Sequence, residues 1–248
     1  MRPWLERLGD ERSLERLNHL STESNLRTAS GQPVRFVPPG DAGAYYEVHL
    51  YRTGQVQTRP DSLHDLFNAL AWLAFPRTKA LINAVHAEEI PREGGRRGRR
   101  RDLVTLLDEG GAIVQCDDPD LVALVRGFRW KELFWAERAR ARRAMRFRVL
   151  GHATLEQALK PWPGIACKAI FVPLEADADA AAHAWLAGLP ADATPRVLAP
   201  LPLFGYPGWL PEGERAGFYD DTRYFRPFRE KRGTALPAPP APPPDGAL

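Results

Sequence analysis

The segment Ser62–His86 (SLHDLFNALAWLAFPRTKALINAVH) constrains the fold of this chain more than any other. Its apolar residues recur at helical spacing on both sides of Pro76. Proline cannot donate a hydrogen bond inside a first helix, but it suits the first turn of a second one. The segment therefore predicts two consecutive helices, at roughly 62–75 and 77–89.

The polar residues of this segment belong to types that are scarce in the chain. Among 248 residues there are four Asn, six His and five Lys, against 29 Arg. A helix face that only meets solvent would usually carry Arg and Glu. Here His can act as a base or metal ligand, Asn can orient a ligand, and Lys can bind an anion. We interpret the set as a candidate site, with a partly buried polar stripe as the alternative. Its members are His64, Asn68, Lys79, Asn83 and His86.

Composition excludes several classes of protein. A hydrophobic content of 44% with seven Trp is enough for a sizeable core. Two cysteines are too few for a disulfide framework and fit a reducing compartment. The charged N-terminus does not read as a signal peptide, and the longest apolar run, Ala69–Phe75, is far shorter than the roughly 20 residues of a membrane span. We expect a cytoplasmic protein without a membrane partner, and the oligomeric state stays open.

The remaining patterns predict a mixed α+β fold. Alternating residues indicate strands at Pro33–Val37 and Ala44–Tyr51, and apolar runs around the turn 108–111 indicate a hairpin over Asp102–Cys116. Strands do not alternate regularly with helices, which argues against a doubly wound sheet. We expect one domain over residues 1–231, with a small sheet packed with helices and an irregular wrap, rich in Pro and aromatics, from 192 to 228. The Pro-rich residues 232–248 are expected to be disordered. Further strands are expected at 145–150 and 167–173, and helices at 10–20, 117–128, 129–143, 153–159 and 177–189.

Two more groups of residues have chemistry to offer. Asp108 and Glu109 are paired carboxylates that can bind a divalent metal or divide acid and base roles, but they also make a good turn. His152 and Glu156 are spaced to face each other on a helix, as a base with its orienting carboxylate, as part of a metal site, or as an ordinary cap.

Charged residues elsewhere complete the candidate list. Lys168 lies among apolar residues at the start of a strand, where it could neutralise an anionic substrate or extend to the surface. Asp220, Asp221 and Arg223 lie between aromatics, as a buried ion-pair network or as part of a site. We place the two aspartates among the metal candidates and the arginine among the substrate-binding ones.

The segment 92–148 is basic. It has 15 Lys and Arg against nine Asp and Glu, a net charge of +6. Such a segment can neutralise phosphates, but no aromatic residues are interleaved with the loop rich in glycine and arginine that is predicted at Pro91–Arg101, and a solvated surface is the alternative. Sequence motifs for mononucleotide or dinucleotide binding, and those of zinc proteases and serine hydrolases, are missing, which argues against a P-loop NTPase or a cofactor-dependent oxidoreductase.

Several of these residues stand in an order that resembles a bacterial family known as domain of unknown function 3025. The resemblance covers about residues 45–227 and implies a single soluble domain, without implying an activity. Arg59 and Asn83 join Lys168 and Arg223 as substrate-binding candidates. The matching runs are Thr58-Arg59, His64–Leu70, Phe75–Lys79, Asn83, His86, Thr105 to Glu109, Gly151–Ala153 with Glu156, Ala166–Ala169 and Phe218–Arg223.

Two hypotheses follow. The first is a hydrolase, with a divalent metal as its candidate cofactor, acting on an anionic small molecule. It requires His64, His86, His152 and the carboxylates at 108–109 to meet in one pocket, with Lys79, Lys168 and Arg223 binding negative charge. The alternative is a non-catalytic domain that binds nucleic acid or a protein through the basic segment 92–148.

Overall fold

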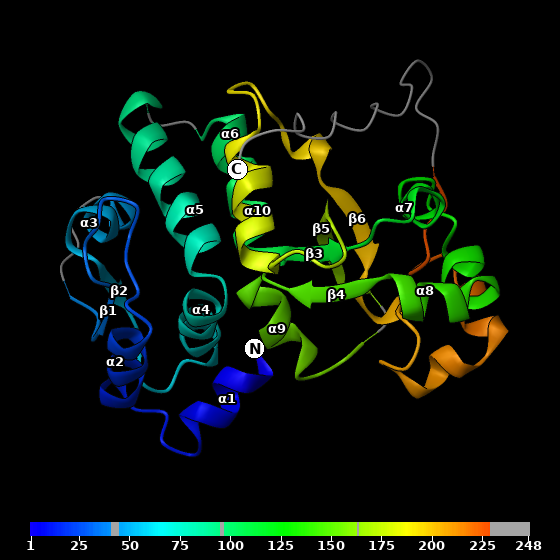
Figure 1. The fold of residues 1–248 in the computed structure, drawn as a ribbon, viewed down its shortest axis with the longest axis horizontal. Coiled ribbons are helices and arrows are strands. Elements are labelled where there is room, and N and C mark those ends of the chain that lie inside the picture. Colours follow the sequence, from blue (N-terminus) through cyan, green and yellow to red (C-terminus); the bar gives the residue numbers. More distant parts are fainter. Residues whose placement is uncertain (41–44, 95–96, 163, 229–248) are drawn as a thin grey trace.

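The computed structural model describes residues 1–40, 45–94, 97–162 and 164–228. The tail 232–248, for which the sequence predicts disorder, lies outside the described residues. A four-stranded sheet and a two-stranded sheet are packed with helices (Figure 1), which confirms the mixed α+β class.

The larger sheet has the strand order β4-β3-β5-β6. β3 pairs in parallel with β5, whereas β4 and β6 run antiparallel to their neighbours at the two edges. Every residue of β3 is buried, as is typical of a central strand covered on both faces. The strands are β3 (Gly111–Gln115), β4 (Arg146–Val149), β5 (Ala166–Val172) and β6 (Ala199–Pro202).

Helices cover both faces of this sheet. On one face, Val114 and Cys167 share a core with helix α7 and with the aromatic residues of the C-terminal turns. On the other face, Ile113 and Ile170 pack with α5, α6 and α10. The bounds are α5 (Pro76–Glu89), α6 (Arg99–Gly110), α7 (Pro119–Arg126) and α10 (Ala178–Ala187). The predicted irregular wrap from 192 to 228 contains β6 and several 3-10 turns, one of which, η6, covers Ala216–Asp220.

A third core lies in the N-terminal part of the chain. Trp72 and Leu70 of α4 pack there against α1, α2 and the two-stranded parallel sheet. Helix α4 also contacts α9, so it joins this core to the larger sheet. The elements are α1 (Arg2–Leu8), α2 (Leu14–Glu23), β1 (Arg35–Val37), α3 (Tyr46–Thr53), β2 (Gln55–Gln57), α4 (Leu63–Ala74) and α9 (His152–Ala158).

The predicted helix pair is confirmed as α4 and α5, separated at Phe75 and Pro76. The Ser62 hydroxyl caps α4 by accepting from the Asp65 N–H at 3.2 Å. The first turn of α5 is capped from far along the chain, because the carboxylate of Asp179 on α10 accepts from the N–H groups of Arg77 and Thr78, both at 2.9 Å. Asp179 is itself buried, so the cap fixes α5 against α10.

The strand predicted over Ala44–Tyr51 is wrong, because residues 46–53 form α3. Tyr46 and Leu50 are four residues apart and pack on the same core, which is the helical spacing. Gly54 ends the helix in the left-handed region (φ 75°), where a Cβ atom would overlap the Pro33 carbonyl. Alternation of residues with period two over eight positions was therefore not enough to distinguish a strand from a helix.

The hairpin predicted over Asp102–Cys116 is also wrong, since its first half is the helix α6 and only its second half is a strand, β3. Leu103, Val104 and Leu107 form a buried helical face against the sheet. Asp108 and Glu109 therefore lie on the last turn of a helix and do not form a hairpin turn. The single helix predicted over 129–143 is divided into a π-helical turn, η2 (Glu132–Ala136), and α8 (Arg138–Ala144).

Candidate metal centre

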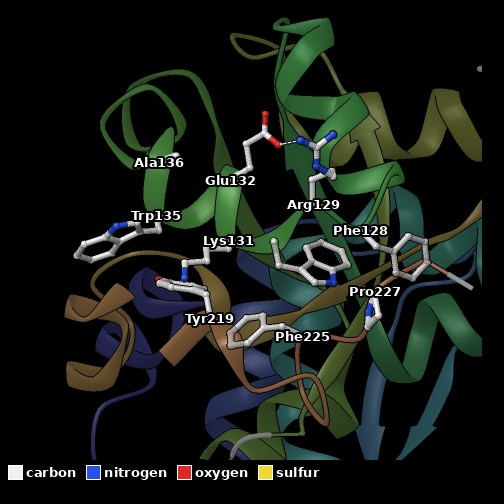
Figure 2. Close-up of a pocket in the computed structure, with 10 residues that line it drawn as sticks. Phe128, Arg129, Lys131, Glu132, Trp135, Ala136, Tyr219, Phe225 and Pro227 are labelled. Carbon is white, nitrogen blue, oxygen red and sulfur yellow. Dashed lines mark ion pairs between the residues drawn. The ribbon is translucent and has the colours of Figure 1, made fainter. Parts of the chain in front are cut away.

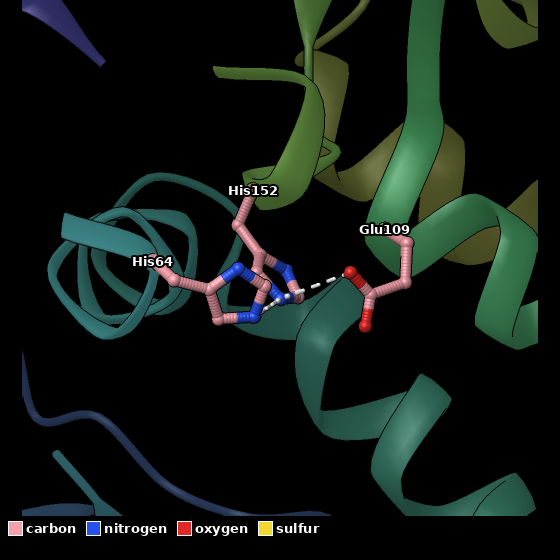
Figure 3. A group of neighbouring side chains, drawn as sticks. All are labelled: His64, Glu109 and His152. Carbon is pink, nitrogen blue, oxygen red and sulfur yellow. Dashed lines mark hydrogen bonds and ion pairs between the residues drawn. The ribbon is translucent and has the colours of Figure 1, made fainter. Parts of the chain in front are cut away.

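Three side chains from separate elements converge where α4 meets α9. His64 comes from the first turn of α4, Glu109 from the last turn of α6, and His152 is the first residue of α9 (Figure 3). The two imidazole Nε2 atoms are 3.1 Å apart, and Glu109 Oε2 is 3.5 Å from His152 Nε2. One ligand atom from each residue lies within 4.8 Å of the other two. We call these three residues the triad.

The spacing of the triad suits a metal ion. Ligand atoms bound tetrahedrally to zinc at about 2.0–2.1 Å lie about 3.3 Å from one another. The separations of 3.1 and 3.5 Å fall on either side of that value. Two histidines and a glutamate are a ligand set of catalytic zinc sites.

Each histidine of the triad turns its other nitrogen toward a carboxylate. His64 Nδ1 is 3.0 Å from Glu156 Oε2, and His152 Nδ1 is 3.9 Å from Asp108 Oδ2. A proton on Nδ1 would donate to the carboxylate and leave the Nε2 lone pair free for a metal, which is the usual arrangement around histidine ligands. Within the described residues, His152 Nδ1 has no partner at full hydrogen-bond distance.

A buried lysine fixes the carboxylate behind His152. Lys79 is 3% exposed, and its ammonium donates to Asn68 Oδ1 at 2.8 Å and to Asp108 Oδ1 at 2.5 Å. Burial alone would raise the pKa of Asp108, but the charge of Lys79 and its hydrogen bond to this carboxylate outweigh burial and hold that pKa below its usual range. Asp108 is therefore ionised beside His152, and Lys79 is engaged in holding it.

The protonation of His152 and Glu109 favours metal binding near neutral pH. Burial lowers the pKa of His152 to about 4, against the opposing charge of Asp108. His152 is therefore neutral at pH 7, as a metal ligand must be. Burial, followed by the charge of Asp108, raises the pKa of Glu109, so a cation at this carboxylate would relieve an unfavourable environment.

One side of the triad is open to solvent. The side chains of His64 and Glu109 are 36% and 46% exposed, and that of Glu156 is 43% exposed, whereas His152 is buried. A catalytic metal needs a position for water or substrate besides its protein ligands. The exposed side of His64 and Glu109 leaves room for one.

The other two candidates on α5, Asn83 and His86, belong to a different cluster, which we call the α5 cluster. Asn83 donates to the backbone carbonyl and to the carboxylate of Glu47, at 3.0 and 2.7 Å. The Arg101 Nε–H donates to His86 Nδ1 at 3.4 Å. Burial raises the pKa of Glu47 and lowers that of His86 to about 4. Among the described residues no hydrogen bond or ion pair links Asn83 or His86 to the triad.

The remaining candidates are not joined to the triad by a hydrogen bond or ion pair in the part of the chain that the structure describes. Arg59 is exposed and pairs with Asp65, with its Nε 2.8 Å from the carboxylate. Lys168 is half-buried on β5, in register with Gly111 of β3. In the C-terminal turns Asp220 accepts from Lys131 at 2.7 Å, and Asp221 pairs with its neighbour Arg223 at 2.8 Å. In the described part of the chain these side chains make no hydrogen bond or ion pair with the triad.

Three residues with a role in these clusters escaped the sequence analysis. Glu47 lay in the segment that was predicted to be a strand. The sequence predicts Arg101 to end the loop at Pro91–Arg101, but it lies in the first turn of α6. Asp179 caps α5 from about 100 residues away. None stands in a local motif, so only the three-dimensional contacts identify them.

Most cations of the basic segment that the structure describes are paired with carboxylates. The ion pairs include Arg92 with Glu88, Arg100 with Glu89, Arg101 with Glu93, Arg140 with Asp118 and Arg146 with Glu175. Such pairing reduces the charge left for phosphates. Binding of nucleic acid stays a prediction.

No helix in the described part of the chain has both the length and the hydrophobicity that crossing a membrane requires.

Comparison with known proteins identifies a family and no individual relative. No curated protein and no solved structure matches the chain. The family model described as "Protein of unknown function (DUF3025)" matches residues 34–229, which is more than half of the chain and includes the whole triad. This match confirms the resemblance found in the sequence and extends it at both ends: the chain belongs to the DUF3025 family.

Proposed function

We propose that the protein binds a divalent metal ion through His64, His152 and Glu109 and acts as a metal-dependent hydrolase. The observation that carries the proposal is the approach of the two Nε2 atoms to 3.1 Å, with each ring turned toward a carboxylate on its Nδ1 side. Metal sites with this ligand set are common in hydrolytic enzymes.

A metal explains the three ligand atoms better than a shared proton does. If both rings keep their protons at Nδ1, two lone pairs oppose each other, which requires a cation between them. A proton could join the two nitrogens, but it would need no third ligand. The Glu109 oxygen at 3.5 Å supplies that third ligand and a negative charge, both of which a divalent ion uses.

The chemistry of the site would be hydrolysis by a metal-bound water. A bound zinc ion lowers the pKa of its water to near 7 and polarises a carbonyl or phosphoryl oxygen. Arg97 is the candidate group for holding negative charge on the substrate, because its side chain is 50% exposed, its charge acts on Glu109, and its Nε is as far as 3.9 Å from its carboxylate partner Asp102. We therefore favour an anionic ester or phosphoester as substrate over a neutral one.

Calorimetric titration with zinc tests the metal site. After treatment with a chelator, the full chain is expected to bind one zinc ion, and His64→Ala, His152→Ala or Glu109→Ala should each weaken binding at least about 100-fold. His19→Ala is the matched control, because His19 is exposed and lies outside the site. Zinc affinity that is equal in all four variants would contradict the assignment, and a parallel titration with Fe(II) identifies the preferred ion.

Turnover tests the hydrolase part separately. The zinc-loaded chain is assayed with p-nitrophenyl esters and phosphodiesters, with Glu109→Ala as the inactive control. Arg97→Ala should raise KM for anionic substrates and leave neutral ones unchanged. Tight zinc binding without hydrolysis of any of these substrates would retain the metal site and remove the hydrolase.

A further inference from the structure

An aromatic cleft of about 440 Å³ lies between η2 and the C-terminal turns. Its rings belong to the core on the face of the sheet opposite to α5 and α6, so the cleft is separate from the triad. Figure 2 shows the labelled rings along it: Trp135 and Tyr219 have centroids 6.4 Å apart, and Tyr219 and Phe225 are 5.1 Å apart. The apolar lining consists of Phe128, Trp130, Trp135, Tyr219, Phe225 and Pro227.

The rim of this cleft is close to electrical neutrality. Lys131 is 2.7 Å from Asp220, and Arg129 pairs with Glu132. Arg138, whose guanidinium lies 5.0 Å from the centre of the Trp135 ring, is held by a carboxylate at 2.7 Å. Cations that are already paired offer little to phosphates, so a single-stranded nucleic acid is a poor fit and an uncharged ligand is a better one.

The aromatic rings and one free donor suit a proline-rich ligand. Polyproline II segments dock on aromatic-lined grooves, and their carbonyl groups have no internal hydrogen bonds. The Trp130 N–H already donates to the Arg226 carbonyl at 2.8 Å. In contrast, the Trp135 N–H has no acceptor among the residues that the structure describes, so it is available to a ligand carbonyl.

The sequence itself contains a proline-rich segment a few residues after the last residue that lines the cleft. Pro227 lines the cleft, and the Phe228 ring lies 5.5 Å from that of Phe128. Residues 235–244 follow (ALPAPPAPPP), with six prolines and no charge. Pro237 is nine residues beyond Phe228, and an extended segment of that length reaches up to about 30 Å.

We propose that the aromatic cleft binds the proline-rich residues 237–244 of the same chain. The charges at the rim of the cleft are paired and the segment carries no charge, and the short connection gives an effective concentration on the order of millimolar. A contact that is weak between separate molecules is therefore sufficient within one chain. The proposal does not depend on the metal site.

Photo-cross-linking in the full chain tests the proposal. p-Benzoylphenylalanine replaces Ala241, and mass spectrometry maps the cross-linked peptides after irradiation. We expect cross-links concentrated on peptides containing Trp135, Tyr219 or Phe225, and at least about fivefold fewer of them in Trp135→Ala, because one wall and its donor are lost. Trp162→Ala is the matched control, since Trp162 is exposed and does not line the cleft.

A tail variant keeps the test valid if the Trp135 variant folds poorly. Replacing Pro239, Pro240, Pro242 and Pro243 with Ser leaves the cleft intact and removes the polyproline preference, so it should lower the cross-link yield to the same extent. Cross-links spread evenly over the surface would overturn the proposal. So would cross-links that, in a mixture of isotope-labelled and unlabelled protein, form only between two chains.

Discussion

The triad takes one residue from α4 and the α5 cluster takes two from α5, the other helix of the predicted pair, but the two clusters differ in what their polar atoms do. In the triad the ligand atoms of His64, Glu109 and His152 face one another, and two of the three side chains are more than one-third exposed. In the α5 cluster, Asn83 and His86 are almost fully buried and each contacts a partner on another helix. The first arrangement leaves ligand atoms free, whereas the second ties them to the protein.

Lys79 lies on the same helix as the α5 cluster but acts on the triad, and it shows how a structural polar residue differs from a functional one. Its ammonium does not face solvent or a ligand, because Asp108 and Asn68 occupy it. It acts on the triad only through Asp108, which faces His152. Some residues of a polar stripe can therefore belong to a binding site while others only stabilise the fold, and substitutions can distinguish the two groups.

The largest expected effect is on stability, from Lys79→Met. Removing one member of a buried ion pair leaves Asp108 without its main partner, which should lower the free energy of unfolding by about 3–5 kcal/mol. Urea denaturation of the chelator-treated protein measures it, with Lys160→Met, an exposed lysine, as control. The double variant Lys79→Met, Asp108→Leu should recover part of the loss, and a loss no larger than that of the control would show that the pair is not structural.

A pH-dependent loss of stability should follow from His86. Its pKa is lowered by burial to about 4 in the folded chain, below its ordinary value in the unfolded chain. The unfolded state therefore binds the proton first, and stability that is complete above about pH 6.5 declines toward pH 4, by up to about 3 kcal/mol. His86→Gln should remove the loss of stability that is due to His86 and leave the loss that is due to His152. Denaturation curves of both proteins at pH 7 and pH 5 measure the difference, and parallel losses in the two would contradict the prediction.

A smaller effect, on metal affinity alone, is expected from Glu156→Gln. The neutral amide orients His64 less firmly than the carboxylate at 3.0 Å, which should weaken zinc binding about 10-fold. Thermal stability without metal should hardly change, because both groups are partly exposed. Glu212→Gln, at an exposed position away from the triad, serves as control; equal zinc affinities in the two variants would assign Glu156 to the surface.

The smallest effect is expected from Arg223→Ala. Arg223 pairs with Asp221 in the C-terminal turns and makes no contact with the triad in the described structure. Its removal should change zinc affinity by less than about twofold. A larger change in the same titration would mean that the C-terminal turns belong to the site after all.

The sequence predicted the helix pair well because local signals agree there. Ser62 is a good cap, Pro76 suits a first turn, and the apolar residues between them keep a helical period. Predictions from the local pattern of residues were wrong at 46–53 and 99–110. There, short apolar runs fit a strand and a helix equally well, and packing against other segments decided between them.

The candidate site was predictable in its residue types and not in its grouping. Scarce His and Asn pointed to α4 and α5, and His152 with Glu156 had the right spacing. The sequence did not show that Asn83 would donate to Glu47, or that the Lys79 ammonium would pair with Asp108. These contacts join residues 29 to 36 positions apart, and short-range periodicity carries no information about them.

The cap that Asp179 places on α5 has a consequence for the order of events on the ribosome. Helix α5 carries Lys79, yet its first turn gains its acceptor only when residue 179 has emerged. Non-local contacts of this kind must wait for the chain that makes them. The polar interior around Asp108 is therefore completed late in synthesis, after the N-terminal core has its residues in place, and a chain truncated before α10 would present an uncapped α5 to solvent.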